Sequence, residues 1–363
     1  MSGKHFILAA GGTGGHMVPA HALGVELMAR GHHVSLLTDA RGAGYPALFD
    51  DIPKHIIPAG RLQGGLLGWL KTWRGVRQGK AAAARLYAGT QPAAVIGFGG
   101  YPALPALLAA QALKIPTIIH EQNAVLGRVN RLLARKCAGI ATSYAEVDRL
   151  PRRYFDKALL TGNPVREEVR ALGGQPYQYL GDDGVFRVLV VGGSQGASVL
   201  SRVVPDALAM LPAAFRRRLQ VTQQCRAEDI EAVRQAYAVS GIPADCATYL
   251  PDLPERLAWT HLLIGRAGAS TISELTAAGR PAILVPLPSA TDDHQTANCR
   301  ELVAAGGARM IPEKSFSPVE LGKQMQKLGL EPDSMQNAAQ RAKSVGHPDA
   351  AIHLADFTER LAA

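Results

Sequence analysis

Short apolar runs recur along the whole chain, separated by stretches in which apolar residues have helical spacing. The first run, FILAA at 6–10, leads into a glycine-rich loop. After that loop Ala20, Leu23 and Leu27 recur every three or four residues, which places them on one face of a helix. Pro19 and Gly31 suit the two ends of that helix. A strand, a loop and a helix in this order are typical of the start of a parallel α/β sheet.

The same opening occurs again near the middle of the chain. FILAAGGTGGH at 6–16 has an echo in RVLVVGGSQGAS at 187–198. Further strand-like runs follow, namely VSLL, HIIP, AAVIGFG, TIIH and GIATS in the first half and RLQVTQQ, HLLIG, AILVPL and ARMIP in the second. This alternation predicts an α/β fold of two doubly wound, Rossmann-like domains, whose glycine loops would face each other across a cleft.

Length and composition agree with two ordinary domains. The chain has 363 residues, of which 47% are hydrophobic and 19% charged, a balance that builds packed cores. We expect an N-terminal domain at 1–164, a second domain at 165–345, and a C-terminal helix at 346–363 that packs back on the first domain. The glycine-rich stretch 171–186 suggests the join between the two domains.

Basic residues are concentrated in the first half. Residues 1–164 contain 19 Lys and Arg against 8 Asp and Glu, whereas the remainder contains 20 against 22. This excess favours an anionic partner such as nucleic acid, phospholipid or a phosphorylated substrate, although a solubilising surface has the same composition. Because no nucleic-acid recognition motif accompanies the charge, we expect no nucleic-acid partner.

Cysteine spacing and apolar run length exclude other classes. The four cysteines, at 137, 225, 246 and 299, form no C-x-x-C pair, so reduced thiols are expected rather than a zinc site or a disulfide framework. The apolar stretch at 101–120 contains three prolines, and we expect neither a signal peptide nor a membrane span.

Neither glycine loop fits a general nucleotide motif. Gly12, Thr13 and Gly14 begin the dinucleotide pattern, but Met17 stands where its third glycine belongs, although Asp39 lies at the end of the next strand. A glycine loop that enters a helix still offers backbone N–H groups to phosphate, while the alternative is a simple tight turn. A third cluster, GFGGY at 97–101, follows another strand, so three loops favour two phosphate groups.

Together the motifs resemble the MurG family of peptidoglycan N-acetylglucosaminyltransferases. They are GGTGGH, GFGGY, HEQN, TGNPVR, GGSQGA, GASTISE and DDHQTAN, in the family's order. The resemblance implies a GT-B fold and inverting transfer of N-acetylglucosamine from UDP-GlcNAc to the 4-hydroxyl of N-acetylmuramyl in lipid I, which gives lipid II. No cofactor is expected, because the chain has no D-x-D motif for a metal. Ala103 departs from the family, which often has a hydroxyl residue there.

The resemblance also implies the residues that meet each substrate. Donor contacts would come from Thr13, Gly14, Gly15, Asn123, Arg166, Ser194, Leu250, Ala269, Ser270, Thr271, Ile272, Ser273, Glu274, Gln295 and Asn298. Ser194 and Arg166 would bind the diphosphate. Glu274 would open a helix after the nucleotide-binding residues 269–273 and bind the ribose. The acceptor diphosphate would meet Gly12, Gly14, Gly15, Gly99, Gly100 and Tyr101. A helix-start carboxylate is the structural alternative for Glu274, and a solvated helix position is the alternative for Gln295.

Single displacement at the anomeric carbon requires a base, and His16 is the candidate. At the start of a helix the dipole favours neutral imidazole, which can accept a proton. The competing role for His16 is to bind the acceptor diphosphate. Glu121 is the alternative base, or it orients His120. His120 and His294 have no second ligand at metal spacing, so no metal site is expected.

The segment RLQGGLLGWLKTWRGVRQGK at 61–80 mixes apolar residues with cations. Its composition is typical of a segment that lies on an anionic bilayer, and the alternative is an amphipathic helix with a solvated basic side. The membrane residues would be Leu66, Leu67, Trp69, Leu70, Trp73, Arg74, Arg77 and Lys80. We therefore expect a peripheral protein at the cytoplasmic face of the plasma membrane, with UDP-GlcNAc, lipid I, the membrane surface and other cell-wall synthesis proteins as partners. The alternatives are another GT-B transferase with a different glycolipid or small acceptor, and a non-catalytic sugar-nucleotide sensor.

Overall fold

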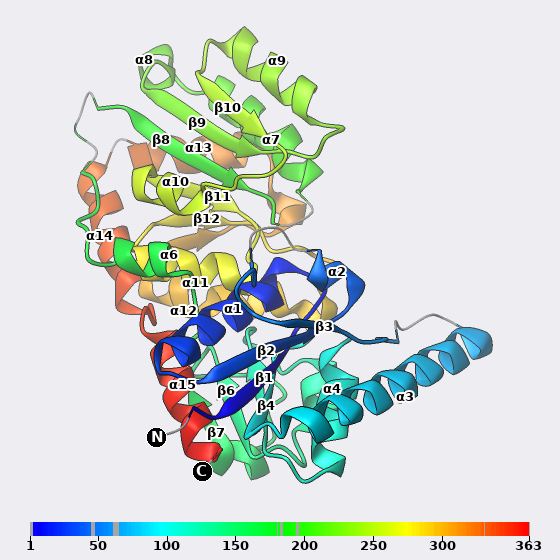
Figure 1. Ribbon diagram of the computed structural model, residues 1–363. Coiled ribbons are helices and arrows are strands. Elements are labelled where there is room, and N and C mark those ends of the chain that lie inside the picture. Colours follow the sequence, from blue (N-terminus) through cyan, green and yellow to red (C-terminus); the bar gives the residue numbers. More distant parts are fainter. Residues whose placement is uncertain are drawn as a thin grey trace. The chain divides into compact units, whose positions relative to one another are not determined.

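The computed structural model describes residues 3–44, 48–60, 65–179, 181, 184–193, 196–329 and 331–362. The chain forms two compact units (Figure 1). Unit 1 comprises residues 1–166 and 347–363, and unit 2 comprises residues 167–346. The stretch 171–186 is not the join suggested by its glycines, because it lies inside unit 2, where the Tyr177 hydroxyl donates to the carbonyl oxygen of His261.

Unit 1 is built on a seven-stranded parallel sheet with the order β3-β2-β1-β4-β5-β6-β7. The strands are β1 (His5–Ala9), β2 (His33–Thr38), β3 (Lys54–Ile56), β4 (Ala94–Gly97), β5 (Thr117–Glu121), β6 (Gly139–Thr142) and β7 (Ala158–Leu160). The strands expected from the first half of the sequence are confirmed. The short edge strand β7 was not expected, and two of its three residues are exposed.

Helices cover both faces of this sheet. They are α1 (Gly14–Ala29), α2 (Ala40–Ala43), α3 (Gly65–Thr90), α4 (Ala103–Ala112), α5 (Arg128–Leu133), the 3₁₀ turn η1 (Arg152–Lys157) and α15 (Ala350–Leu361). Because side chains alternate along a strand, Phe6 and Leu8 pack with α1 and α15, whereas Ile7 and Ala9 pack with α3 and α4. The predicted core face of α1, Ala20, Leu23 and Leu27, is buried.

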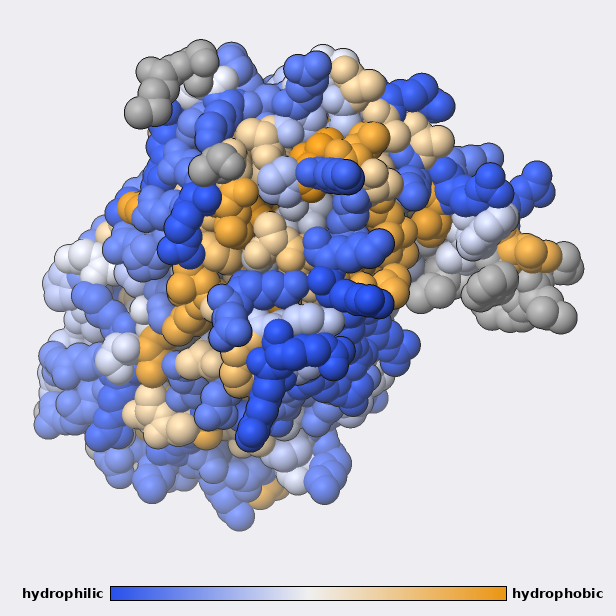
Figure 2. All heavy atoms as spheres, turned by 90° about the horizontal axis from the view of Figure 1, so that it is seen from below, coloured by the Kyte–Doolittle hydropathy of each residue, from blue (hydrophilic) through white to orange (hydrophobic). Residues whose placement is uncertain are grey.

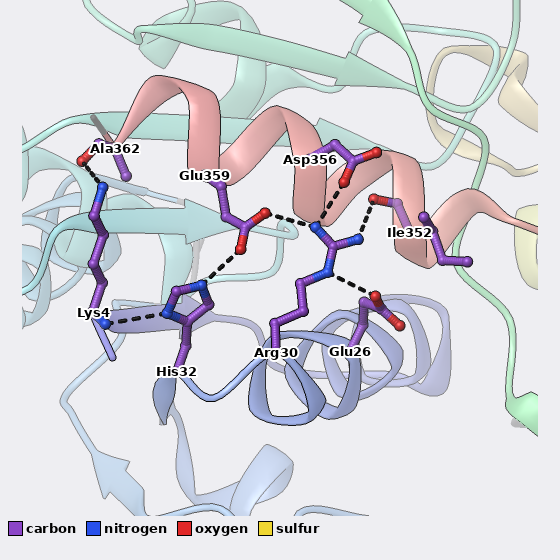
Figure 3. A network of polar contacts seen from close by, with 8 residues as sticks. All are labelled: Lys4, Glu26, Arg30, His32, Ile352, Asp356, Glu359 and Ala362. Carbon is purple, nitrogen blue, oxygen red and sulfur yellow. Dashed lines mark hydrogen bonds and ion pairs between the residues drawn. The ribbon is translucent and has the colours of Figure 1, made fainter. Parts of the chain in front are cut away.

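A polar network joins the C-terminal helix α15 to α1 within unit 1 (Figure 3). The Arg30 guanidinium contacts Glu26 at 2.8 Å, Asp356 at 2.7 Å and Glu359 at 2.6 Å. Partial burial acts to lower the pKa of Arg30, but the hydrogen bonds to these carboxylates raise it overall. His32 Nε2 lies 2.7 Å from a second oxygen of Glu359. The last helix is thus tied to the first helix of the chain by both packing and charge.

Unit 2 contains a six-stranded parallel sheet with the order β10-β9-β8-β11-β12-β13. Its strands are β8 (Phe186–Val191), β9 (Leu219–Gln224), β10 (Ala244–Ala247), β11 (Leu262–Gly265), β12 (Ala282–Leu284) and β13 (Ala308–Met310). Its helices are α6 (Glu167–Leu172), α7 (Ser198–Ala209), α8 (Ala213–Arg216), α9 (Ile230–Ser240), α10 (Leu253–Trp259), α11 (Ala269–Ala278), α12 (His294–Ala305), α13 (Pro318–Gly329) and α14 (Pro332–Ser344), with 3₁₀ turns η2 (Thr291–Asp293) and η3 (Glu313–Ser315).

The two sheets share one topology. In each, the first strand of the unit lies between the second and the fourth, so the chain changes direction across the sheet beside that strand. Ligands of open parallel sheets bind at the carboxyl ends of strands beside such a switch point. The glycine loops after β1 and β8 therefore occupy the place in each unit where a ligand is expected.

Candidate functional site

The two glycine loops of unit 1 pack directly against each other. Gly100 has φ +77°, and a Cβ atom there would lie 2.5 Å from the carbonyl oxygen of Gly11. A Cβ atom on Gly11 would in turn meet the Pro102 ring at 2.6 Å. Both loops leave neighbouring strands, β1 and β4, at the same edge of the sheet. The structure thus brings together Gly11–Gly15 and Gly99–Tyr101, the two loops expected to meet the acceptor.

A second feature of unit 1, beside these loops, is the N-terminus of α1. Thr13 is the N-cap residue, in an extended conformation, and its side chain makes no capping hydrogen bond. The first N–H groups of a helix have no acceptor within the helix, and they carry the positive end of its dipole. No acidic residue occupies the first turn, which contains Gly14, Gly15 and His16. This end of α1 can therefore hold an anion.

His16 projects from that first turn onto the GFGGY loop. A Cβ atom on Gly99 would lie 3.0 Å from the ring carbon Cε1 of His16, so the absence of a side chain at 99 makes room for the ring. His16 Nδ1 lies 3.0 Å from Gln122 Oε1. The ring is thus held between one loop and the end of β5.

Gln122 continues the contact to His120, which is buried. Gln122 Nε2 lies 2.8 Å from His120 Nδ1 and 3.0 Å from the backbone oxygen of His120. His120 Nε2 lies 3.0 Å from the carbonyl oxygen of Gly162. Burial lowers the pKa of His120 to about 4, the hydrogen bond to Gly162 acts in the other direction, and the charge of His16 lowers it further. Gln122 was not among the site residues expected from the sequence, although the i, i+2 spacing of His120 and Gln122 at a strand end indicates that both lie on one face.

Glu121 has a different position from the one expected of a base. It is only 2% exposed, and each carboxylate oxygen accepts two hydrogen bonds. Oε1 accepts from the backbone and side-chain nitrogens of Asn123 at 3.0 and 3.2 Å, and Oε2 accepts from Gly127 N and Asn130 Nδ2, both at 2.8 Å. Both carboxylate oxygens are therefore engaged by groups of this chain and are not presented to a substrate hydroxyl. Glu121 instead organises the loop after β5 and the start of α5. The His120 ring is held by Gln122 and Gly162 rather than by Glu121.

In unit 2 the two ends of the loop after β8 pack closely against each other. A Cβ atom on Gly192 would lie 2.5 Å from the backbone nitrogen of Ala197, and Gly192 N–H donates to Gln224 Oε1 at 3.2 Å. Ser194, expected to bind phosphate, lies outside the described residues. Leu250 is buried in the segment after β10, and Arg166 is the last residue of unit 1 before the chain enters unit 2.

The GASTISE motif forms the start of α11. The helix begins at Ala269, with Gly268 as its N-cap, so Glu274 lies in the second turn. The expectation that Glu274 opens a helix is wrong, and so is its alternative as a helix-start carboxylate. Among the described residues, the buried Ser270 hydroxyl has no hydrogen-bond partner, which is expected of a group that meets a ligand. Thr271, Ile272 and Ser273 complete this turn, and the Ile272 side chain is buried.

The DDHQTAN motif forms η2 and the start of α12. Asp292 and Asp293 have φ values of 56° and 53°, a left-handed conformation that is strained for residues other than glycine and is frequent at functional sites. Gln295 Oε1 accepts from Leu287 N–H at 2.9 Å, and Asn298 Nδ2 donates to the oxygen of Ala267 at 3.2 Å. Gln295 is therefore not a freely solvated position. Both amides hold loops that follow β11 and β12.

Arg266 is a functional candidate that sequence reasoning missed. It is buried directly after β11, where Nη1 donates to the oxygens of Val285 and Pro286, and Nη2 lies 2.6 Å from Glu313. The signal for it is a cation placed directly between a buried strand and a glycine loop. Among the described residues, no group of three or more His, Cys, Asp or Glu side chains is arranged to hold a metal ion.

Helix α3 contains the segment expected to meet a membrane. Leu70 is 50% exposed and Trp73 47% exposed, and the Arg77 guanidinium lies 4.7 Å from the Trp73 ring centroid. The C-terminal half of α3 is anchored in the core by Ala83 and Tyr87. In Figure 1 the N-terminal end of α3 projects from unit 1, and Figure 2 shows apolar surface beside the point where the helix leaves the unit.

The remaining membrane residues are only partly described. The side chains of Leu66, Leu67 and Trp69 lie outside the described part of the structure, whereas Arg74 and Lys80 are exposed on the same helix. Within the described ranges, no helix combines the length and the apolar character needed to cross a bilayer.

Comparison with known families gives matches over both halves of the chain. The glycosyltransferase family 28 N-terminal domain matches residues 6–142, and the family 28 C-terminal domain matches residues 187–354. These two ranges contain the glycine loops after β1 and β8.

Curated relatives match the chain almost from end to end. A UDP-N-acetylglucosamine–N-acetylmuramyl-(pentapeptide) pyrophosphoryl-undecaprenol N-acetylglucosamine transferase from Zymomonas mobilis is 62% identical over 99% of this chain and 92% of its own length. The protein of the same name from Novosphingobium aromaticivorans is 60% identical over 99% of this chain and 93% of its own length.

Solved structures agree in fold. MurG from Acinetobacter baumannii has a TM-score of 0.74 and 30% identity, covering 98% of this chain and 99% of that one. A UDP-GlcNAc 2-epimerase from Neisseria meningitidis, solved with UDP-GlcNAc bound, has a TM-score of 0.67 and 13% identity, covering 98% of this chain and 100% of that one. At that identity the second likeness concerns the fold alone.

Proposed function

Because the chain belongs to glycosyltransferase family 28, in the branch of the pyrophosphoryl-undecaprenol N-acetylglucosamine transferases, we propose that it transfers N-acetylglucosamine from UDP-GlcNAc to lipid I. The observation that carries this proposal is the 62% identity over 99% of the chain. The reaction forms lipid II and is an inverting transfer to the 4-hydroxyl of N-acetylmuramyl. The chain is thus a UDP-GlcNAc-dependent hexosyltransferase with a GT-B fold.

We assign the acceptor side of the reaction to unit 1. The N-terminus of α1 and the interlocked loops at Gly11–Gly15 and Gly99–Tyr101 offer backbone N–H groups to the acceptor diphosphate. His16, in the same turn, takes the proton of the 4-hydroxyl while its oxygen bonds to the anomeric carbon. The bond from that carbon to the donor phosphate breaks in the same step, and UDP leaves.

We assign the donor side mainly to unit 2. We place the donor diphosphate between the loop after β8 and the N-terminus of α11. The first N–H groups of α11 have no acceptor within the helix, and the unpartnered Ser270 hydroxyl supports a ligand there. Glu274 is the candidate for the ribose, and Gln295 and Asn298 are candidates for the sugar. Thr13, Asn123 and Arg166 are the donor residues proposed from unit 1.

Transfer of radiolabelled N-acetylglucosamine to a lipid I analogue tests the proposed function. We expect labelled disaccharide product at equal rates with and without EDTA, and no product from an analogue that lacks the 4-hydroxyl. Transfer only to a different glycolipid or small acceptor would favour another GT-B activity. Binding of UDP-GlcNAc without any transfer would favour a sensor.

The exposed part of α3 supports a peripheral position on the anionic cytoplasmic face of the plasma membrane. Trp73 and Leu70 are half-exposed beside Arg77, a combination of apolar and cationic groups that suits an anionic lipid interface. The polyprenyl tail of the acceptor lies in that bilayer, so this contact would keep enzyme and acceptor together. Contacts with other cell-wall synthesis proteins belong to the same proposal.

Replacing Trp73 and Leu70 together with Ser is expected to weaken binding to vesicles that contain phosphatidylglycerol by roughly tenfold or more, because partial burial of two large apolar side chains is lost. Sedimentation of the protein with vesicles at several salt concentrations measures this. Val239→Ser, which changes an exposed residue of unit 2, is the matched control. Equal binding of the double variant and the control would argue against α3 as the membrane contact.

A further inference from the structure

A series of hydrogen bonds runs from His16 through Gln122 and His120 to Gly162. This series determines which nitrogen of His16 carries the proton. We propose that Gln122 and His120 are positioning residues, which hold the His16 tautomer with its proton on Nδ1, so that Nε2 is the nitrogen that receives the proton from the acceptor hydroxyl. The catalytic meaning of this inference rests on the proposed function. The tautomer itself follows from four contacts within unit 1.

At one end of this series of hydrogen bonds is the carbonyl oxygen of Gly162, which can only accept a hydrogen bond. His120 Nε2 lies 3.0 Å from it, so Nε2 must carry a proton. The backbone at Gly162 is closely packed. Gly162 has φ +81°, and a Cβ atom there would lie 2.4 Å from His347 Cβ and 2.9 Å from Ala350 Cβ at the start of α15.

Burial then determines the other nitrogen of His120. The ring is completely buried, which disfavours the charged imidazolium, and the pKa of His120 is lowered to about 4. A neutral imidazole with its proton on Nε2 has a lone pair on Nδ1. His120 Nδ1 is therefore an acceptor, and the atom 2.8 Å away on Gln122 must be a donor.

A separate contact fixes the orientation of the Gln122 amide. Its Nε2 also lies 3.0 Å from the backbone carbonyl oxygen of His120, which is again an obligatory acceptor. If the amide were reversed, its oxygen would face that carbonyl oxygen and the His120 lone pair. Gln122 Nε2 thus donates both of its hydrogens to His120, and Oε1 faces His16.

The last contact joins Gln122 Oε1 to His16 Nδ1. An amide oxygen can only accept a hydrogen bond, so His16 Nδ1 must donate to it across 3.0 Å. In the neutral ring this leaves the lone pair on Nε2, the nitrogen suited to act as a base. When Nε2 takes up a proton, the Nδ1–H bond to Gln122 is kept, so no rearrangement accompanies the transfer. The proton moves from the 4-hydroxyl to His16 Nε2, and the hydrogen bonds from His16 Nδ1 to Gln122 and from Gln122 to His120 are unchanged.

His16 contacts the end of β5 and the loop at 97–101, and both carry ionisable residues. On β5 they are His120, held neutral, and Glu121, whose carboxylate is occupied by Asn123, Gly127 and Asn130. The adjoining loop contributes Tyr101, and the first turn of α1 contains no acidic residue. A neutral amide, rather than a carboxylate, therefore faces Nδ1 directly.

The proposal is tested by two substitutions at Gln122 with opposite electrostatic effects. Gln122→Met keeps the volume but removes the acceptor, and we expect kcat to fall roughly 10- to 100-fold while KM for UDP-GlcNAc changes little. Gln122→Glu keeps an acceptor for Nδ1–H and adds a negative charge. Its second oxygen replaces the Nε2 donor to His120, so its kcat can also fall. The distinguishing result is the pH profile, in which we expect the acidic limb of kcat/KM against pH to move up by about one unit or more.

The matched control is Gln111→Met, which removes another partly buried glutamine of unit 1, one that donates to the oxygen of Leu133 outside the site. We expect wild-type kcat and pH profile from this variant. Equal pH profiles for Gln122→Met, Gln122→Glu and wild type would overturn the proposal, because a merely structural Gln122 would not move the limb.

Nitrogen-15 NMR of histidine-labelled protein gives a second readout that does not depend on activity. We expect His16 above its pKa to have Nδ1 protonated, with the resonance assigned by its loss in His16→Ala. Protonation on Nε2 in the wild type would overturn the inference even if transfer to lipid I is normal. Conversely, the expected tautomer in a protein that transfers no sugar would uphold the positioning role and contradict the proposed function.

Discussion

Replacement of His16 with Ala is expected to lower kcat for transfer to a lipid I analogue by roughly 10²- to 10⁴-fold, the usual contribution of a general base. Affinity for UDP-GlcNAc should change little, because the ring lies between Gly99 and Gln122 in unit 1 and the main donor candidates belong to unit 2. Steady-state kinetics with each substrate varied in turn measure kcat and both KM values.

His33→Ala is the matched control, because His33 is an exposed histidine at the start of β2 and lies outside the proposed site. We expect it to transfer sugar at the wild-type rate. If His16→Ala kept its kcat and instead raised KM for the lipid acceptor, His16 would be a ligand of the acceptor diphosphate rather than the base. Normal kcat and KM would exclude both roles.

Acidification from about pH 6.5 to about pH 4 is expected to destabilise unit 1 by roughly 3 kcal/mol through His120 alone. Burial lowers the pKa of this histidine to about 4, from 6.5 in the unfolded chain. Between these two values the unfolded state binds the additional proton, so the free energy of unfolding falls as the pH falls. Above pH 6.5 both states hold neutral His120, and its contribution no longer depends on pH.

Denaturant unfolding followed by tryptophan fluorescence separates the two units. The three tryptophans are Trp69, Trp73 and Trp259, so in a Trp259→Phe background the signal reports unit 1. We expect His120→Gln in this background to be less dependent on pH between 4 and 6.5, whatever its stability at neutral pH. An unchanged pH dependence in that variant would show that the loss comes from other groups.

The corresponding group in unit 2 is His261. Burial lowers its pKa to about 4, with the charges of Arg187, Arg280 and Arg218 acting in the same direction. Its Nδ1 accepts from the backbone N–H of Arg187 at 3.0 Å, which requires an unprotonated nitrogen. Acid should therefore weaken both units, and Trp259 fluorescence in a variant that lacks the other two tryptophans reports the second.

Local sequence patterns predicted most of the sheet. The apolar runs that became β2, β4, β5 and β6 are buried on both faces, and such strands are visible as continuous apolar segments. The edge strands β7 and β10 contain several exposed residues, so no comparable run marks them. The start of α11 was also misplaced, because Gly268 acts as its N-cap without a side-chain cap that a sequence would reveal.

The amino-acid sequence is enough to recognise the family, the repeated strand, glycine loop and helix, and the position of His16 in the first turn of α1. These features depend on residues that are neighbours along the chain, or on motifs that relatives share. The sequence also shows which residue types stand at 120–123, namely a histidine, a glutamate, a glutamine and an asparagine, but it does not show what each of them does.

Those roles depend on contacts that form only when the chain folds. Gln122 reaches a ring 106 positions away, and His120 reaches a carbonyl oxygen 42 positions away. Glu121 is enclosed by four donors from the loop that follows it and from α5. A hydrogen bond depends on distance and direction in space, and side chains on adjacent residues of a strand point to opposite faces. For that reason Glu121, which the sequence placed beside the base as its rival, faces away from it, while Gln122 holds the base.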